Sequence, residues 1–399
     1  MRGFIVFVLE TLAVTKVGVT SLPERRGTAL VAVLGFGGVV LVLTGMLSIG
    51  AGFASVVSRN GSADVAVVMR GGSTSEISSG FGIDAVRAVA QSPGVRQADG
   101  VPEVSAEVLV VVDVAKRSTG KDSNVPFRGV GDQAYRLHPK VRVIDGRMYE
   151  PGRGEVIVGR QAASEFAGLE IGGKRRWQGF EWTVVGVFEA GGGLEESEIW
   201  TDDRTLQTAF ERGSYWQSAY ARLESKEAFI GFKDSLTKNP QLNVTVQRQD
   251  EYLKAQTEAL SIFISVAGFA IAFLMGLGAI FGAVNSMYSA VVARSLEIAT
   301  LRALGFGRFA VLVSVLFEAM VLGAVGGLVG GGAAWLMFNG YQASTLNFMS
   351  FSQVAFEFAV TPALLTTGVV YALVLGFIAG LAPAIRAARM PIAAALRQH

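Results

Sequence analysis

Hydrophobic and polar positions are distributed very unevenly along this chain of 399 residues. Four long apolar runs are separated by polar segments, and the first such segment, residues 54–258, is by far the longest. The runs are residues 28–53, 259–285, 309–338 and 360–383. Each is longer than the roughly 20 apolar residues with which a helix crosses the hydrocarbon core of a bilayer. The pattern predicts a membrane α-helical protein with four transmembrane helices and one large water-exposed domain.

The segment 54–258 has the alternating apolar and polar pattern of a globular domain, and it predicts a mixed α+β fold inserted between helices 1 and 2. Two strand–helix–strand units flank an insertion of about residues 141–216, so we expect a split α/β subdomain. The predicted strands are Val65–Met69, Val104–Val112, Glu155–Val158, Trp182–Phe188, Tyr220–Leu223 and Leu242–Val246. The predicted helices are Ile83–Ala90, a segment capped by Ser225 that carries Phe229, Phe232 and Leu236, and Gln249–Ala259, which continues into the second run.

The distribution of basic residues predicts the orientation of the spans. Lysine and arginine gather in residues 1–27, 286–308 and 384–399, whereas the short loop 339–359 contains neither. Because loops rich in lysine and arginine stay in the cytoplasm, both termini and the 286–308 loop are expected there. The domain 54–258 and the 339–359 loop are then expected on the opposite side.

Residues 1–27 favour a helix on the inner membrane surface over a cleaved signal peptide. Glu10 and Lys16 interrupt the apolar stretch, and no cleavage motif follows it. The side chains expected to face lipid are Phe4, Phe7, Val8, Leu12 and Val19.

Composition and motifs narrow the classes of function. A net charge of only +2 gives no support for a nucleic-acid partner. The absence of cysteine excludes disulfides and thiolate metal sites, and two histidines, His138 and His399, exclude a histidine-rich one. Gly168–Arg175 resembles a phosphate loop but ends in arginine where a magnesium-binding hydroxyl belongs. We interpret Asp202 and Asp203 as a solvated helix start. No catalytic, cofactor-binding or metal site is therefore expected in this chain.

Small residues and one acid stand out within the apolar runs. Glycines four residues apart let helix backbones approach closely, for ordinary packing or for a dimer interface. These glycines are Gly278 and Gly282, Gly323 and Gly327, Gly326 and Gly330, and Gly327 and Gly331. Glu318 is a candidate functional residue, because an acid within a span is costly. It is expected either to be protonated or to pair with a polar group on a neighbouring helix.

The loop 286–308 predicts a short amphipathic helix that ends at Gly305 and Gly307. Its apolar residues are Leu296, Ala299, Leu301 and Leu304, and its charged residues are Arg294, Glu297 and Arg302. A short helix that projects between two spans can dock in a groove of another protein. A solvated helix without a partner is the alternative.

The loop resembles that of permeases in the MacB/LolC/FtsX group of ABC transporters, also called type VII. The matching residues are Arg294, Glu297, Ile298, Arg302, Ala303, Leu304 and Gly305. The resemblance extends to Phe317–Ala319 and the glycines from Gly323, to the motif from Pro383 to Arg397, and to Asp145–Arg147 and Val185–Phe188. The last two are similar to the periplasmic core domain of that group. The order of one span, a large domain and three spans is also that of the group.

This resemblance implies a bacterial inner-membrane protein that forms a dimer or pairs with a homologous permease. The loop helix would be the coupling helix that docks on a separate cytoplasmic ATPase, which would bind ATP and magnesium. Its residues would be Arg294, Glu297, Ile298, Leu301, Arg302, Ala303, Leu304 and Gly305. ATP hydrolysis would move the periplasmic domain, which is called mechanotransmission, to export or extract cargo with a periplasmic adaptor or effector. The alternative is an FtsX-type signalling permease that activates a periplasmic hydrolase without transport.

Overall fold

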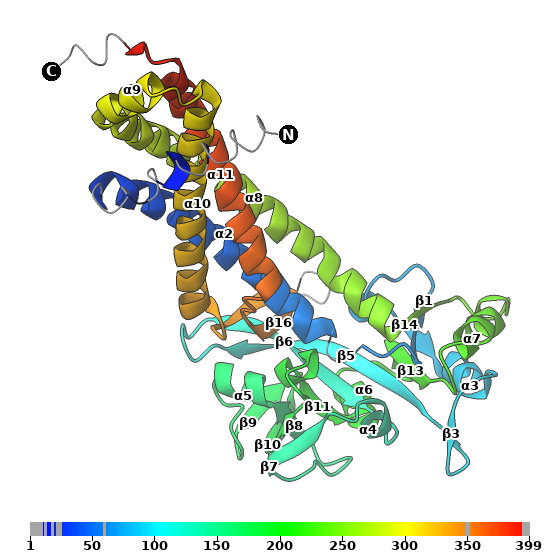
Figure 1. The fold of residues 1–399 in the computed structure, drawn as a ribbon. Coiled ribbons are helices and arrows are strands. Elements are labelled where there is room, and N and C mark those ends of the chain that lie inside the picture. The colour runs from blue at the N-terminus through cyan, green and yellow to red at the C-terminus, as the bar shows by residue number, and fades with distance from the viewer. Residues whose placement is uncertain are drawn as a thin grey trace. The chain divides into compact units, whose positions relative to one another are not determined.

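The computed structural model describes residues 11, 14–16, 20, 26–58, 61–347 and 352–392 of the chain (Figure 1). The chain forms two compact units. The helical bundle contains the chain up to Gly52, Ser261–Tyr341 and the chain from Phe358 onward. The head contains Phe53–Leu260 and Gln342–Glu357. The side chains of the predicted surface helix, from Phe4 to Val19, and the tail residues Leu396 and Arg397 lie outside the described residues.

Among the described residues, four helices are long and apolar enough to cross a membrane. They are α2 (Arg26–Ser58), α8 (Gln249–Ala293), α10 (Arg308–Phe338) and α11 (Pro362–Arg389). A short fifth helix, α9 (Ser295–Ala303), connects α8 to α10. These helices contain the four apolar runs, except that α11 begins two residues after the start of the fourth. The helix α8 begins at Gln249, so the helix predicted before the second run is confirmed.

The helix α11 begins at a capping residue and ends beyond the predicted span. The hydroxyl of Thr361 accepts a hydrogen bond from the amide of Leu364 (3.3 Å), which caps the helix, and Pro362 fits the first turn because its missing N–H needs no partner there. At the other end the helix continues past Pro383 to Arg389, so the predicted tail 384–399 begins as part of a long helix.

The glycines of α10 pack against two other helices of the bundle. A Cβ atom at Gly323 would lie 2.6 Å from the carbonyl oxygen of Ala372 in α11. One at Gly330 would lie 2.2 Å from the carbonyl oxygen of Gly37 in α2. Both distances are shorter than a van der Waals contact, so only glycine permits these helix crossings. Gly327 lies against Val369 and Ala372, and Gly331 lies against Leu365. The two predicted glycines of α8, Gly278 and Gly282, meet no other described atom within 4 Å of the Cβ position.

The head is built on one ten-stranded sheet in the order β14-β1-β13-β5-β6-β11-β8-β10-β7, with β9 paired to β10. In its first part β1, β13, β14 and the start of β5 are antiparallel, and α3 and α7 pack on one face through Val89 and Phe232 (Figure 1). The bounds are β1 Val65–Arg70, β5 Val104–Ala115, β13 Ser218–Arg222, β14 Val244–Arg248, α3 Ile83–Gln91 and α7 Ala228–Thr237.

The second part of the sheet mixes parallel and antiparallel pairs around a core of aromatic residues. Phe127, Phe166 and Trp182 are fully buried on one face, and Phe188 and Trp200 on the other. The strands are β6 Asp122–Val130, β7 Arg142–Gly146, β8 Glu155–Gly159, β9 Lys174–Trp177, β10 Phe180–Glu189 and β11 Ile199–Asp202. The helices are α4 Ala134–Leu137, α5 Arg160–Glu165, α6 Asp203–Ala209 and the 3-10 turns η2 Glu76–Ser78 and η3 Leu194–Ser197. Short pairs are β2 Phe81–Gly82 with β12 Tyr215–Trp216, and β3 Gln97–Ala98 with β4 Val101–Pro102.

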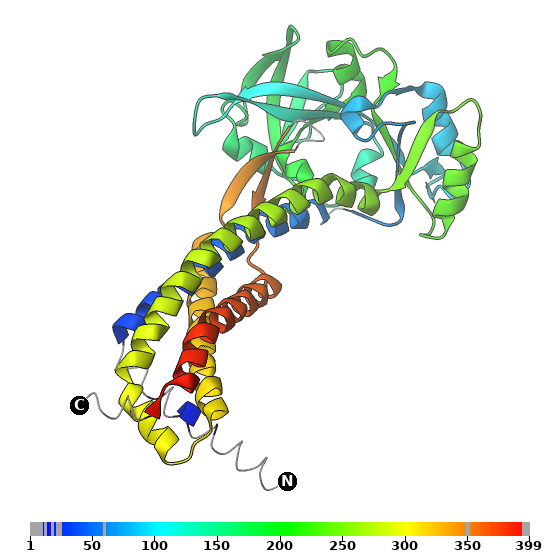
Figure 2. The same cartoon turned by 90° about the horizontal axis from the view of Figure 1, so that it is seen from above.

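Three features of the head differ from the sequence interpretation. Residues 104–107 of β5 pair with β13 and residues 108–115 pair with β6, so the second part of the sheet begins before the predicted insertion at 141. The helix α7 begins after Glu227, so the prediction that Ser225 caps it is wrong. The loop 339–359 contains an unpredicted hairpin, β15 (Gln342–Asn347) and β16 (Ser352–Glu357), which contacts β6 (Figure 2).

Candidate functional site

The helix α9 lies at one end of the bundle, beside the C-terminal end of α11 (Figures 1 and 2). Arg294 separates it from α8, because its backbone (φ −105°, ψ 15°) leaves the helical conformation for one residue. Gly305 follows the helix with φ +102°, a conformation that favours glycine. The amide of Phe306 then bonds to the carbonyl of Leu301, which closes the helix end before α10 begins. The short helix that the sequence predicts in this loop is therefore present.

The two faces of α9 differ in exposure. Ile298 and Ala299 are buried against the bundle, whereas 41% of Leu296 and 74% of Leu304 are exposed. Leu296, Thr300 and Leu304 follow one another at intervals of four residues, so they lie along one side of the helix. This exposed side, Leu296–Thr300–Leu304, is called the leucine face below. Leu301, one of the predicted docking residues, is only half-buried and belongs to neither face.

An ion pair holds the beginning of α9 to the bundle. The Nη1 atom of Arg294 lies 3.3 Å from the Oε2 atom of Glu318 in α10, and its Nε atom lies 2.9 Å from Glu297. Only 3% of Glu318 is exposed. Glu318 therefore pairs with a polar group, as one of the two expectations has it, although the partner lies at the junction of α8 and α9 and not within a helix. The partner is the first residue of the loop motif. Removing one member of such a buried pair typically costs about 3–5 kcal/mol, because the other charge is left buried without a partner.

A second contact holds the end of α9. The guanidinium of Arg302 donates a hydrogen bond to the backbone carbonyl of Met390, the residue that follows α11. The two arginines of the loop motif thus bind α9 to α10 at its start and to α11 at its end. The sequence showed the arginines but not these partners, which lie 24 and 88 residues away along the chain.

The head contains a buried cluster of charges that sequence reasoning missed. Arg128 of β6 is bonded to Glu198 at 2.8 and 2.9 Å, to Glu107 at 2.9 Å and to Glu76 at 3.0 Å. All four residues are buried. They come from β5, β6, η2 and the residue between η3 and β11, so no local motif could have indicated the cluster. Tyr220 also donates a hydrogen bond to Glu76.

His138 extends this charge cluster. Its two ring nitrogens each lie 3.3 Å from a carboxylate oxygen, one of Glu107 and one of Glu195. Burial opposes a charge on the ring, but the two carboxylates outweigh it and raise the pKa of His138 to about 10. Burial also raises the pKa of Glu198, despite the attraction of Arg128. Because each of these charged groups is engaged by another, the cluster favours a structural role within the head.

The other sequence candidates in the head are structural. Gly168–Arg175 forms glycine turns that lead into β9, which begins at Lys174. Asp202 caps α6 by accepting a hydrogen bond from the amide of Thr205 (2.8 Å), which confirms a helix start. Asp203 accepts one from the indole of Trp216 (3.0 Å), and both aspartates are half-buried, so the interpretation as solvated is wrong. Among the described residues, no group of three or more His, Asp or Glu side chains could hold a metal ion.

Comparisons with known proteins identify two family regions. Residues 29–239 match the MacB-like periplasmic core domain, and residues 269–392 match the FtsX-like permease C-terminal region. No protein with a curated description matches the chain significantly.

Two solved structures resemble the chain over about half its length. The periplasmic region of MacB from Actinobacillus actinomycetemcomitans is 12% identical, with a TM-score of 0.37, and the match covers 49% of this chain and 94% of that one. The extracellular domain of the noncanonic ABC-type transporter YknZ from Gram-positive bacteria is 18% identical, with a TM-score of 0.35. That match covers 46% of this chain and 99% of the YknZ domain.

Proposed function

This chain belongs to the MacB/FtsX-like family of ABC transporter permeases, and from that premise we propose that α9 binds a separate cytoplasmic ABC ATPase. Permeases of this family are not catalytic themselves, so ATP and magnesium would be bound by the ATPase. The observation that carries the proposal is the leucine face of α9, which is exposed while Ile298, Ala299 and Arg294 hold the helix to the bundle.

The two anchors of α9 provide a route for movement. A displacement of α9 would pull on α10 through Arg294 and Glu318, and on α11 through Arg302 and the carbonyl of Met390. The close glycine contacts of α10 with α11 and α2 would carry that displacement to the other spans, because closely packed backbones cannot slide freely. Hydrolysis of ATP on the partner would thus move the membrane helices.

The proposal places α9 and both termini on the cytoplasmic side of a bacterial inner membrane and the head in the periplasm. A second permease, either a copy or a homologue, would cover α8. Support for this partner comes from Gly278 and Gly282, which face open space, and from exposed apolar neighbours such as Phe273 and Phe281.

We propose that the movement of the head serves to export or extract periplasmic or membrane cargo with a periplasmic adaptor. The alternative, activation of a periplasmic hydrolase, is disfavoured by the size of the domain, about two hundred residues between the first and second spans. A reading frame for an adaptor beside this one would support export, and one for a hydrolase would support signalling.

The docking proposal is tested by placing a charge on the leucine face. Leu304→Asp and Leu296→Asp should each abolish copurification of the ABC ATPase expected from the neighbouring reading frame, because a carboxylate would have to be buried in an apolar contact. Ile230→Asp is the matched control, since Ile230 is 69% exposed on α7 of the head. Copurification and ATP hydrolysis would be measured on full-length permease in detergent.

Equal ATPase recovery with Leu304→Asp, Leu296→Asp and the wild type would refute docking through α9. If Ile230→Asp also lost the ATPase, the loss would reflect general damage to the permease and not a change in the leucine face. A retained monodisperse elution profile of the two α9 variants is required for the expected result.

A further inference from the structure

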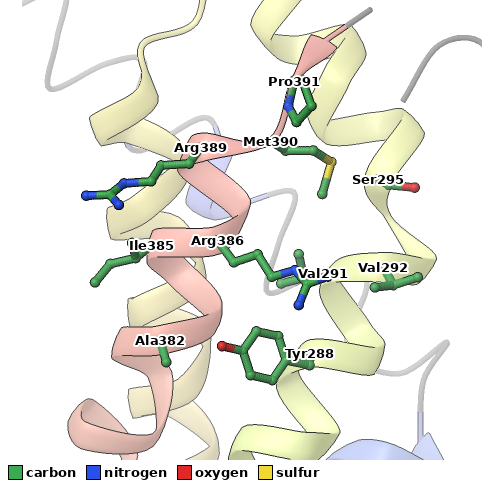
Figure 3. Close-up of a pocket in the computed structure, with 10 residues that line it drawn as sticks. All are labelled: Tyr288, Val291, Val292, Ser295, Ala382, Ile385, Arg386, Arg389, Met390 and Pro391. Atoms are coloured by element: carbon green, nitrogen blue, oxygen red, sulfur yellow. The ribbon is translucent and has the colours of Figure 1, made fainter. Parts of the chain in front are cut away.

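A pocket of about 790 Å³ lies within the bundle, between the last turns of α8 and those of α11 (Figure 3). Its volume falls in the range of sites that hold small molecules. Most of its wall is apolar, and the side chains that form this wall are Val291, Val292, Ala382, Ile385, Met390 and Pro391.

Two arginines, Arg386 and Arg389, line this pocket, and Arg386 is the one that stacks on an aromatic ring. Figure 3 shows Arg386 reaching from α11 toward α8, where its guanidinium carbon lies 5.4 Å from the ring centroid of Tyr288. In the part of the chain that the structure describes, no carboxylate forms a salt bridge with Arg386, and no acidic side chain lines the pocket. The stacking on Tyr288 fixes the position of the positive charge and leaves its hydrogen-bond donors open to a ligand.

A fixed cation beside an apolar wall suits a ligand that has both an anionic group and hydrocarbon. Basic pockets between membrane helices on the cytoplasmic side bind anionic headgroups in this way. An inorganic phosphate would use the cation but leave the exposed side chains of Val292 (57%) and Ile385 (40%) without an apolar partner. An acyl chain would cover them.

We propose that this pocket binds an anionic phospholipid, with the headgroup phosphate on Arg386 and an acyl chain along Val292 and Ile385. The inference rests on the proposed membrane orientation, and it does not depend on ATPase docking. Ser295, the first residue of α9, also lines the pocket. The bound lipid therefore contacts α8, α11 and the start of α9 together, next to the anchor that Arg294 makes.

The test measures lipid binding to the full chain. Delipidated permease in detergent is titrated with phosphatidylglycerol or phosphatidylcholine, and bound lipid is counted by native mass spectrometry. The wild type should bind phosphatidylglycerol about fivefold more tightly, since one basic side chain contributes roughly 1 kcal/mol toward anionic lipid. Arg386→Gln should remove this preference. Arg308→Gln is the matched control, because Arg308 is an exposed arginine at the start of α10 and does not line the pocket.

A second variant tests the apolar wall of the pocket independently of the arginine charge. Val292→Trp should fill the apolar side of the pocket and weaken both lipids without changing any charge. Three results would overturn the proposal. These are a preference retained in Arg386→Gln, an equal loss in Arg308→Gln, and displacement of phosphatidylglycerol by inorganic phosphate, which would indicate a simple ion site. ATPase copurification measured on the same samples reports on docking separately.

Discussion

Replacing Arg128 with methionine would test the charge cluster of the head. Methionine keeps most of the aliphatic volume, so the main change is loss of the guanidinium from among Glu76, Glu107 and Glu198. Three buried carboxylates would be left with one cation, His138, which contacts only Glu107 of the three. Removing one partner of a buried ion pair typically costs about 3–5 kcal/mol. We expect the free energy of unfolding of the head to fall by about that amount.

Thermal unfolding of the full chain in detergent would measure this loss. Four of the five tryptophans lie in the head, so intrinsic fluorescence mainly reports its unfolding. A loss of 3–5 kcal/mol lowers the midpoint of a domain of this size by roughly 6–20 °C. Arg153→Met is the control, because Arg153 is exposed and pairs with an exposed Glu150, and surface pairs contribute about 0–1 kcal/mol.

The dependence on pH gives this prediction a second readout. Without the guanidinium, the pKa values of Glu107 and Glu198 rise, because burial raises them and the attraction of Arg128 no longer opposes it. Groups with raised folded-state pKa values stabilise the fold below the unfolded pKa and lose that effect as pH rises. The variant should therefore be least stable near neutral pH and approach the wild type toward pH 4.5. A midpoint equal to that of Arg153→Met, or a loss that does not change with pH, would refute the structural role of the cluster.

Three further predictions concern other parts of the chain. Because the pKa of His138 is raised to about 10, its charged ring stabilises the head fully below pH 6.5, and this stabilisation is lost as pH rises toward 10. The effect amounts to at most about 5 kcal/mol. Denaturant titrations of His138→Asn should lack this alkaline loss. Gly330→Val should abolish a monodisperse elution profile, because its Cβ would lie 2.2 Å from the α2 backbone, whereas Gly332→Val, which faces open space, should elute normally. Glu318→Gln should reduce stimulation of the ATPase by roughly tenfold to a hundredfold at normal abundance, because a hydrogen bond to a charged group contributes about 1.5–3 kcal/mol and this one holds Arg294. Full stimulation with reduced thermal stability would limit Glu318 to packing.

Features encoded by contiguous residues were predictable. Apolar runs of more than 20 residues identify the spans, because crossing a bilayer requires satisfied backbone groups and apolar side chains in one continuous helix. The loop helix was predictable from its spacing and from Gly305, which the backbone needs at φ +102°. The strands β1, β5, β8 and β10 followed from their apolar patterns, with ends displaced by only a few residues.

The tertiary structure decided which side chains meet. The partner of Glu318, the exposure of Leu304 in place of Leu301, and the cluster around Arg128 all join residues far apart in the chain. Local periodicity carries no information about such contacts, because they depend on how separate helices and strands pack. The sequence by itself therefore determined the spans, the loop helix and the family, whereas only the packed structure decided how α9 is anchored and which of its faces is free for a partner.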